Sequence, residues 1–203
     1  MKLSRWLIAP LALTLLFWGP PASAFPNHNT PAKAKLPAPA GHGVVISSSG
    51  APRKCVVKAS QLHISPVGKA SIWDVKISLV LDNYTVKSEF EGHHGFINVN
   101  VLPEGEYQFY PHSLNAASYR VLGRGRFSVK AGETVYIGEI FRVAGCGDSG
   151  GRMGLEVRDQ QARDLEMAKR LRSEIDTTRV VKRLAYVEED VGIDGRPVEA
   201  PKR

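Results

Sequence analysis

The feature that most constrains the fold is a series of short runs between residues 43 and 145 in which apolar and polar side chains alternate. In the clearest run, the side chains of one face are Val75, Ile77, Leu79 and Leu81. Successive side chains of a β-strand point to opposite faces, so the alternation predicts strands with one dry side. Several such strands at short spacing favour a mostly β fold, an antiparallel β-sandwich or barrel.

Turn residues between the runs suggest how the first strands connect. The pair Asp82-Asn83 predicts a tight turn into a second run at residues 84–90. A third run follows at residues 96–102, after a glycine-rich turn. We expect these three runs to form an antiparallel meander.

The pattern changes to that of a helix after the predicted sheet. Leu165, Ala168, Leu171 and Ile175 recur at intervals of three and four residues, and residues 157–175 contain no Gly or Pro. Such spacing places the four side chains on one side of a helix. We expect this narrow apolar stripe to pack on the sandwich, with a partner-binding helix as the alternative.

The first 24 residues are predicted to be a signal peptide. Lys2 and Arg5 precede an apolar run, and the small residues Ala22-Ser23-Ala24 follow a Gly-Pro-Pro break. The run is short for crossing a hydrocarbon core of about 30 Å, and no later stretch has spanning length. We therefore expect cleavage after Ala24 and a secreted or periplasmic protein that has no transmembrane segment after cleavage.

These observations divide the chain into five predicted segments. They are a signal peptide (1–24), a Pro/Ala-rich linker (25–42), a β-sandwich domain (43–155), a C-terminal helix (156–176) and a polar tail (177–203). Apolar residues between Thr178 and Val187 could add a further strand or helical turn within the last segment.

The two cysteines, Cys55 and Cys146, are the only ones in the chain. Export brings a protein into an oxidising compartment, so we expect one disulfide between them. Free thiols or metal ligands are the alternatives. Neither cysteine belongs to a C-x-x-C pair, which makes a structural zinc site a poor interpretation.

The basic charge is concentrated at one end of the sequence. The chain carries a formal charge of +7, and the excess that remains after signal cleavage falls within residues 25–74. A nucleic-acid module would carry a basic stripe on its folded body, so we expect no nucleic-acid partner. We interpret the basic segment as a solvated tail, with contact to an anionic envelope surface as the alternative.

Three stretches of the predicted sheet resemble a known pattern. Residues 102–109, 127–132 and 136–138 look like the L-P-x-G-x-Y … F-x-V-x-A-G-x-x-x-Y-[IL]-G pattern of transthyretin-like β-sandwiches, including carboxypeptidase regulatory-like domains. In this interpretation Gly105 and Gly132 supply hairpin turns. The resemblance implies a transthyretin-like or immunoglobulin-like sandwich that serves as an accessory or binding module and has no catalytic site.

The segment from Cys146 to Gly151 reproduces the G-D-S-G-G string of chymotrypsin-like serine proteases, with Ser149 in the place of the nucleophile. That chemistry needs a histidine base, and His63 lacks the Ala-Ala-His-Cys context in which that family presents it. The chain before Ser149 is also short for the two barrels of that fold. We therefore interpret the string as a glycine-rich loop, with a serine hydrolase as the alternative.

The pair His93-His94, flanked by glycines, is the other candidate site. Adjacent side chains on a strand point to opposite faces, so the two imidazoles share a metal only if the turn is irregular. A weak copper or zinc site completed by His112 or a glutamate is the alternative to a solvated turn. We expect no cofactor.

The aromatic residues of the mature chain are predicted to fill the core rather than to form a sugar-binding platform. This prediction covers Trp73, Tyr84, Phe90 and Phe96. The sequence thus favours a non-catalytic exported envelope module that binds an unknown protein or surface component.

Overall fold

The computed structural model describes residues 36–53, 60–69, 71–82, 87–113, 124–143 and 154–188. The elements in these ranges are β1 (His42–Ala51), β2 (Ser60–Pro66), a 3-10 helix (Ile72–Asp74), β3 (Ile77–Asp82), β4 (His94–Pro103), β5 (Gly105–Ser113), β6 (Arg124–Val129), β7 (Thr134–Arg142), β8 (Leu155–Arg158), α1 (Gln161–Leu171), a second 3-10 helix (Thr177–Arg179), β9 (Val181–Lys182) and β10 (Tyr186–Glu188).

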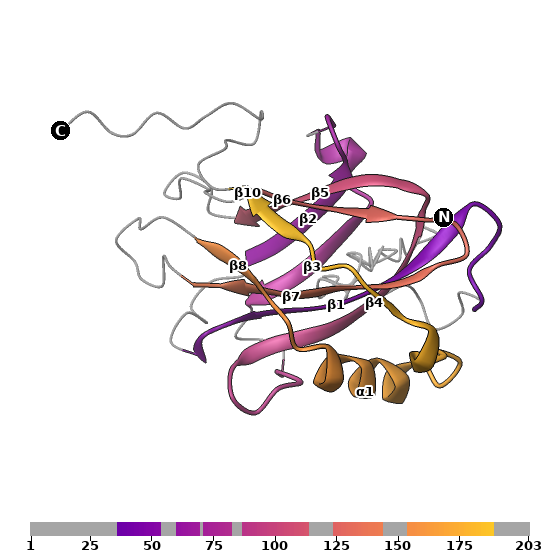
Figure 1. Cartoon of the computed structure of the whole chain (residues 1–203). Coiled ribbons are helices and arrows are strands. Elements are labelled where there is room, and N and C mark those ends of the chain that lie inside the picture. The colour runs from indigo at the N-terminus through magenta and orange to yellow at the C-terminus, as the bar shows by residue number, and fades with distance from the viewer. Residues whose placement is uncertain are drawn as a thin grey trace, which may run out of the picture.

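The strands form two sheets that pack face to face, with α1 beneath one of them (Figure 1). Sheet A has the order β4-β1-β7-β8, with β9 also paired to β7, and sheet B has the order β10-β6-β5-β2-β3. The predicted mostly β sandwich with one helix is therefore confirmed. The sandwich is not purely antiparallel, because β7 runs parallel to both β1 and β9.

Apolar residues fill two layers, one on each side of sheet A. The layer between the sheets includes Leu62, Phe109 and Ile137, all of them completely buried. The second layer lies between the outer face of sheet A and α1, and it includes Ile46 and Ala168. Because sheet A is covered on both faces, β1 is buried along almost its whole length rather than at alternate positions.

The predicted connections between strands are wrong. β3 pairs with β2 in sheet B, whereas β4 pairs with β1 in sheet A, so the expected meander does not form. The turns at Gly105 and Gly132 are not hairpins, because each joins a strand of one sheet to a strand of the other. Alternation identifies the dry face of a strand, but it does not identify the strand beside it. Residues 83–86 of the second run lie outside the described ranges, and residues 87–90 are not in a strand.

The helix is shorter than predicted, and the chain around it belongs to the sheets. Strand β8 precedes α1 and pairs with β7, while β9 and β10 follow it and join sheets A and B respectively. Part of the predicted tail is therefore strand. The stripe packs on sheet A through Ala168 and Leu165, as expected, but Leu171 remains 46% exposed and Ile175 is buried beyond the end of the helix.

The aromatic prediction is right for Phe90 and Phe96 and wrong for Trp73. Phe90 and Phe96 are buried, but Trp73 is 91% exposed, because it lies in the loop between β2 and β3 rather than in a strand. Tyr84, the two cysteines and Ser149 lie outside the described ranges. Among the helices that the structure describes, none has the length and apolarity needed to cross a membrane.

Candidate functional site

A bulge in strand β7 places the side chain of Glu139 on the outer face of sheet A. Ile46 is paired with Tyr136 but Ser48 with Glu139, so two residues of β7 oppose one residue of β1. Gly138 lies in the bulge with φ of +101°, a conformation that favours glycine. The extra residue turns Glu139 toward α1, on the same face as Tyr136 and Ser48.

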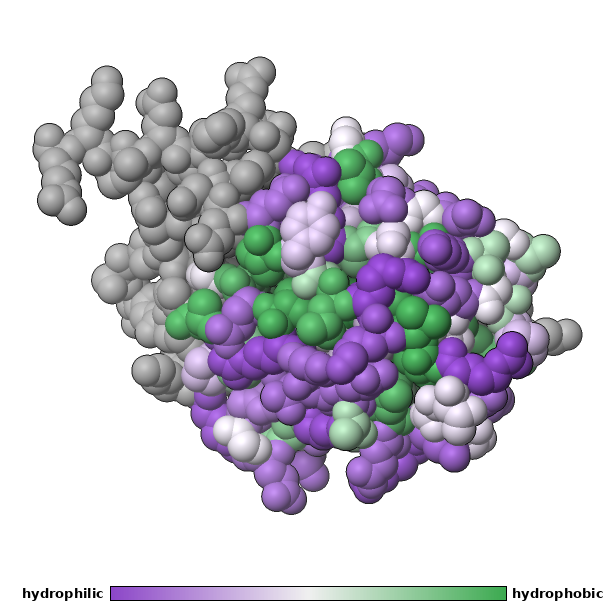
Figure 2. All heavy atoms as spheres, viewed as in Figure 1, coloured by the Kyte–Doolittle hydropathy of each residue, from purple (hydrophilic) through white to green (hydrophobic). Residues whose placement is uncertain are grey.

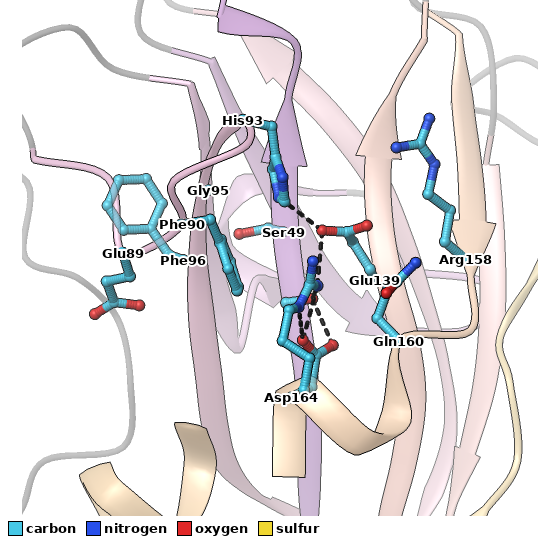
Figure 3. A network of polar contacts seen from close by, with 12 residues as sticks. Ser49, Glu89, Phe90, His93, Gly95, Phe96, Glu139, Arg158, Gln160 and Asp164 are labelled. Carbon is cyan, nitrogen blue, oxygen red and sulfur yellow. Dashed lines mark hydrogen bonds and ion pairs between the residues drawn. The ribbon is translucent and has the colours of Figure 1, made fainter. Parts of the chain in front are cut away.

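The carboxylate of Asp164 is the centre of the polar network on this face (Figure 3). Asp164 lies in the first turn of α1 and is completely buried. Its Oδ2 accepts hydrogen bonds from Ser48 Oγ at 2.6 Å and from the Tyr136 hydroxyl at 2.9 Å. The Tyr136 oxygen in turn accepts the backbone N–H of Gln160 at 3.0 Å, so the network also satisfies the start of the helix.

The guanidinium of Arg163 links two buried carboxylates. Its Nε donates to Asp164 Oδ1 at 2.9 Å, and its Nη2 donates to Glu139 Oε1, also at 2.9 Å. The guanidinium carbon lies 4.2 Å from the centre of the Phe90 ring, which gives a cation–π contact. Arg163 thereby ties α1 to strand β7 and to the segment before β4.

His93 closes the network on the other side of Glu139. Its Nε2 lies 2.8 Å from Glu139 Oε1, so the two side chains form an ion pair when the imidazole is protonated. The imidazole stacks on Phe90, with ring centres 4.8 Å apart, and meets the ring of Phe141 edge-on at 5.3 Å. Figure 3 shows the imidazole directed from its turn toward Glu139.

Burial dominates the electrostatics of this network. It lowers the pKa of His93, an effect that Glu139 opposes and Arg163 reinforces. Burial raises the pKa of the Asp164 carboxyl, against hydrogen bonds from Ser48 and Arg163 that lower it. For Arg163 burial lowers the pKa, but the two carboxylates more than offset this and leave it raised. The pKa of Tyr136 is raised by burial and by the neighbouring Asp164 charge.

The arrangement is that of a structural clamp. Ser48, Tyr136, Glu139 and Asp164 are each at most 1% exposed. Ser48 and Tyr136 donate hydrogen bonds to Asp164, and Glu139 accepts one from Arg163. Only Arg163 and His93 reach the surface in part. A substrate would therefore have to displace α1 to reach the buried hydroxyls and carboxylates.

The structure separates the two histidines that the sequence singled out. His93 faces Glu139 on the outer side of sheet A, whereas His94 meets Phe96 edge-on, with ring centres 5.1 Å apart, on the inner side. Within the described part of the chain, no group of three or more His, Cys, Asp or Glu residues is placed to hold a metal ion. The side chain of His112 and all of Ser149 lie outside the described structure, and His63 packs edge-on against Tyr110.

Sequence reasoning missed the clamp, although one signal was present. Asp164 is four residues before Ala168 and so lies on the apolar stripe of the helix. A carboxylate at such a position indicates a buried polar partner. The role of Glu139 had no comparable signal, because it depends on the bulge at Gly138.

A second feature lies where the chain after α1 meets the end of sheet A. A pocket of about 370 Å³ is lined by apolar residues, among them Val44, Ile175 and Val181, and by charged ones such as Glu133 and Arg179. Three apolar side chains between residues 181 and 186 are exposed. Val181 and Leu184 are each 40% exposed, and Tyr186 is 56% exposed. We call Val181, Leu184 and Tyr186 the edge surface.

No known protein family has a model that matches this sequence, and no curated protein is significantly similar to it.

Proposed function

We propose that this chain is a non-catalytic exported module of the cell envelope that binds another protein through its edge surface. The observation that carries the proposal is the contrast between two parts of the molecule. The buried ionisable groups of the clamp are paired with one another, whereas exposed apolar side chains gather beside a pocket. Figure 2 shows apolar residues gathered near the middle of the face in view, with polar residues around them.

The edge surface has the form that an extended partner needs. It runs from β9 to β10. Among the described strands, β9 pairs only with β7 and β10 pairs only with β6. From Val181 to Tyr186 the chain covers roughly 16 Å when extended, at about 3.3 Å per residue. The pocket beside Val181 has room for one apolar side chain, which would serve as the anchor of the partner.

This proposal agrees with the binding or accessory role that the transthyretin-like resemblance implies. Export after cleavage at Ala24 and a disulfide between Cys55 and Cys146 belong to the same proposal. Both can be read from the mass of the protein isolated from the envelope.

Site-specific photo-crosslinking in the producing cell tests the proposal. A crosslinking side chain placed at Leu184 or Tyr186 should give an adduct of one defined mass. The matched control is Leu171, which is similarly exposed but lies on α1. A Leu184→Asp substitution should abolish the adduct formed at Tyr186, whereas Leu171→Asp should leave it unchanged.

The melting temperature of each variant shows whether it still folds. The proposal fails if folded protein gives no adduct at Leu184 and Tyr186. It also fails if the same adducts form from Leu171, since that result would mean that exposure alone explains the contact.

A further inference from the structure

The most exposed large apolar side chain of the described structure is the indole of Trp73. It is 91% exposed and lies in the 3-10 helix Ile72–Asp74, within the connection between β2 and β3. Tryptophan has a large apolar ring and one N–H donor, and most of its surface is normally removed from water. Exposure of almost the whole side chain therefore calls for an explanation.

The loop holds Trp73 outward through a set of fixed contacts. The carbonyl of Lys69 accepts hydrogen bonds from Ser65 Oγ at 2.6 Å and from Gln108 Nε2 at 2.7 Å, and both donors belong to completely buried residues of sheet B. Nearer the indole, Asp74 N donates to the Ser71 carbonyl at 2.9 Å. The contacts of Lys69 attach the loop to sheet B, and the Asp74–Ser71 contact closes the turn that carries Trp73.

Two exposed lysines flank Trp73 in the sequence. Lys69 precedes it and Lys76 follows it, and neither forms an ion pair with another described residue. Asp74 is the only acidic residue between positions 66 and 76. The loop therefore combines one exposed indole with an excess of positive charge.

We infer that the Trp73 loop contacts the surface of an anionic phospholipid membrane. Indole rings favour the headgroup region, where the apolar body and the N–H donor are both accommodated. Lysines beside it gain from the negative potential of anionic lipids. One tryptophan and two lysines give a weak, reversible contact with the membrane surface. The inference rests on the proposed function only in requiring export, and it uses a surface distinct from the edge surface.

The sequence supplies its own reporter for this contact. Trp73 is the only tryptophan outside residues 1–24, so the fluorescence of the mature protein reports on this side chain alone. We would titrate residues 25–203 with vesicles of phosphatidylglycerol and phosphatidylethanolamine at low salt. The emission should shift to shorter wavelength and should be quenched by brominated lipid chains. Vesicles of phosphatidylcholine should bind more weakly, and added salt should weaken the binding to anionic vesicles.

Matched variants distinguish electrostatic binding from nonspecific adsorption to the vesicles. Replacing Lys69 and Lys76 with Gln keeps the reporter and should lower the partition coefficient roughly fivefold for each lysine. Lys169→Gln, at an exposed position on α1, is the control and should change nothing. Trp73→Ala, followed by co-sedimentation and checked for folding by its melting curve, should lose binding.

The inference is overturned if the emission does not shift at millimolar anionic lipid, or if the lysine variants bind as well as the parent protein. A shift produced by soluble peptidoglycan fragments but not by vesicles would also overturn it in favour of a glycan. Vesicle binding does not require the edge surface, so Leu184→Asp should retain it. Loss of crosslinking together with intact vesicle binding would refute the proposed function alone.

Discussion

Removal of the Asp164 carboxylate should strongly destabilise the protein. Asp164→Ala leaves the hydroxyls of Ser48 and Tyr136 without their acceptor, and both residues are completely buried. Arg163 keeps Glu139 as a partner, so its charge is not left alone. The perturbation is therefore dominated by two unpaired buried donors.

The size of the effect follows from these contacts. An unsatisfied buried donor costs about 1–3 kcal/mol, so two of them cost about 3 kcal/mol when both lie in the lower half of that range. A domain of this size loses about 2–4 °C of melting temperature per kcal/mol. We expect Asp164→Ala to melt roughly 6–12 °C below the parent protein. Asp164→Asn should lose less, because the amide oxygen can still accept from both hydroxyls.

The assay is thermal unfolding followed by circular dichroism, with Glu166→Gln as the control. Glu166 is on the same helix and forms a surface ion pair with Arg170, so its loss should lower the melting temperature by about 1–2 °C at most. Equal melting temperatures for Asp164→Ala and Glu166→Gln would refute the view that the clamp holds α1 on the sheet.

Three further predictions concern pH, the bulge and the disulfide. Because burial lowers the pKa of His93 below its ordinary value of 6.5, the folded state binds fewer protons than the unfolded state. The free energy of unfolding should therefore be level above about pH 7 and should fall as the pH drops below 6.5. The fall should be smaller in the His93→Phe variant. Urea unfolding at several pH values measures both. Gly138→Ala should lower the free energy of unfolding by more than about 2 kcal/mol, because its Cβ would lie 2.5 Å from Val157 in a positive-φ bulge. Gly92→Ala should have little effect, since its Cβ would meet no atom within 4 Å; similar unfolding curves for the two glycine variants would contradict this. If Cys55 and Cys146 form a disulfide, the mature protein should weigh about two hydrogens less than its reduced form. Reduction should lower the free energy of unfolding by up to about 4–5 kcal/mol in the chain-entropy model. An unchanged mass after reduction would exclude the bridge.

Local patterns in the sequence were enough to predict the class of fold and the dry faces of its strands. Alternation at Ile77, Leu79 and Leu81 is a local property of an extended chain, and these residues are indeed buried. The stripe through Ala168 likewise identified the side of the helix that packs on the sheet. Both predictions succeeded because periodicity is set by the geometry of a single element.

Which strands are neighbours, and which polar groups meet, depends on contacts between distant parts of the chain. Pairing of β1 with β4 and β7 joins residues far apart in the chain, and no local pattern records that choice. The clamp needs the bulge at Gly138 to turn Glu139 toward Arg163, so its geometry exists only once sheet and helix are assembled. Trp73 shows the converse case, because an aromatic residue that composition would place in the core is presented to solvent by the contacts of its loop.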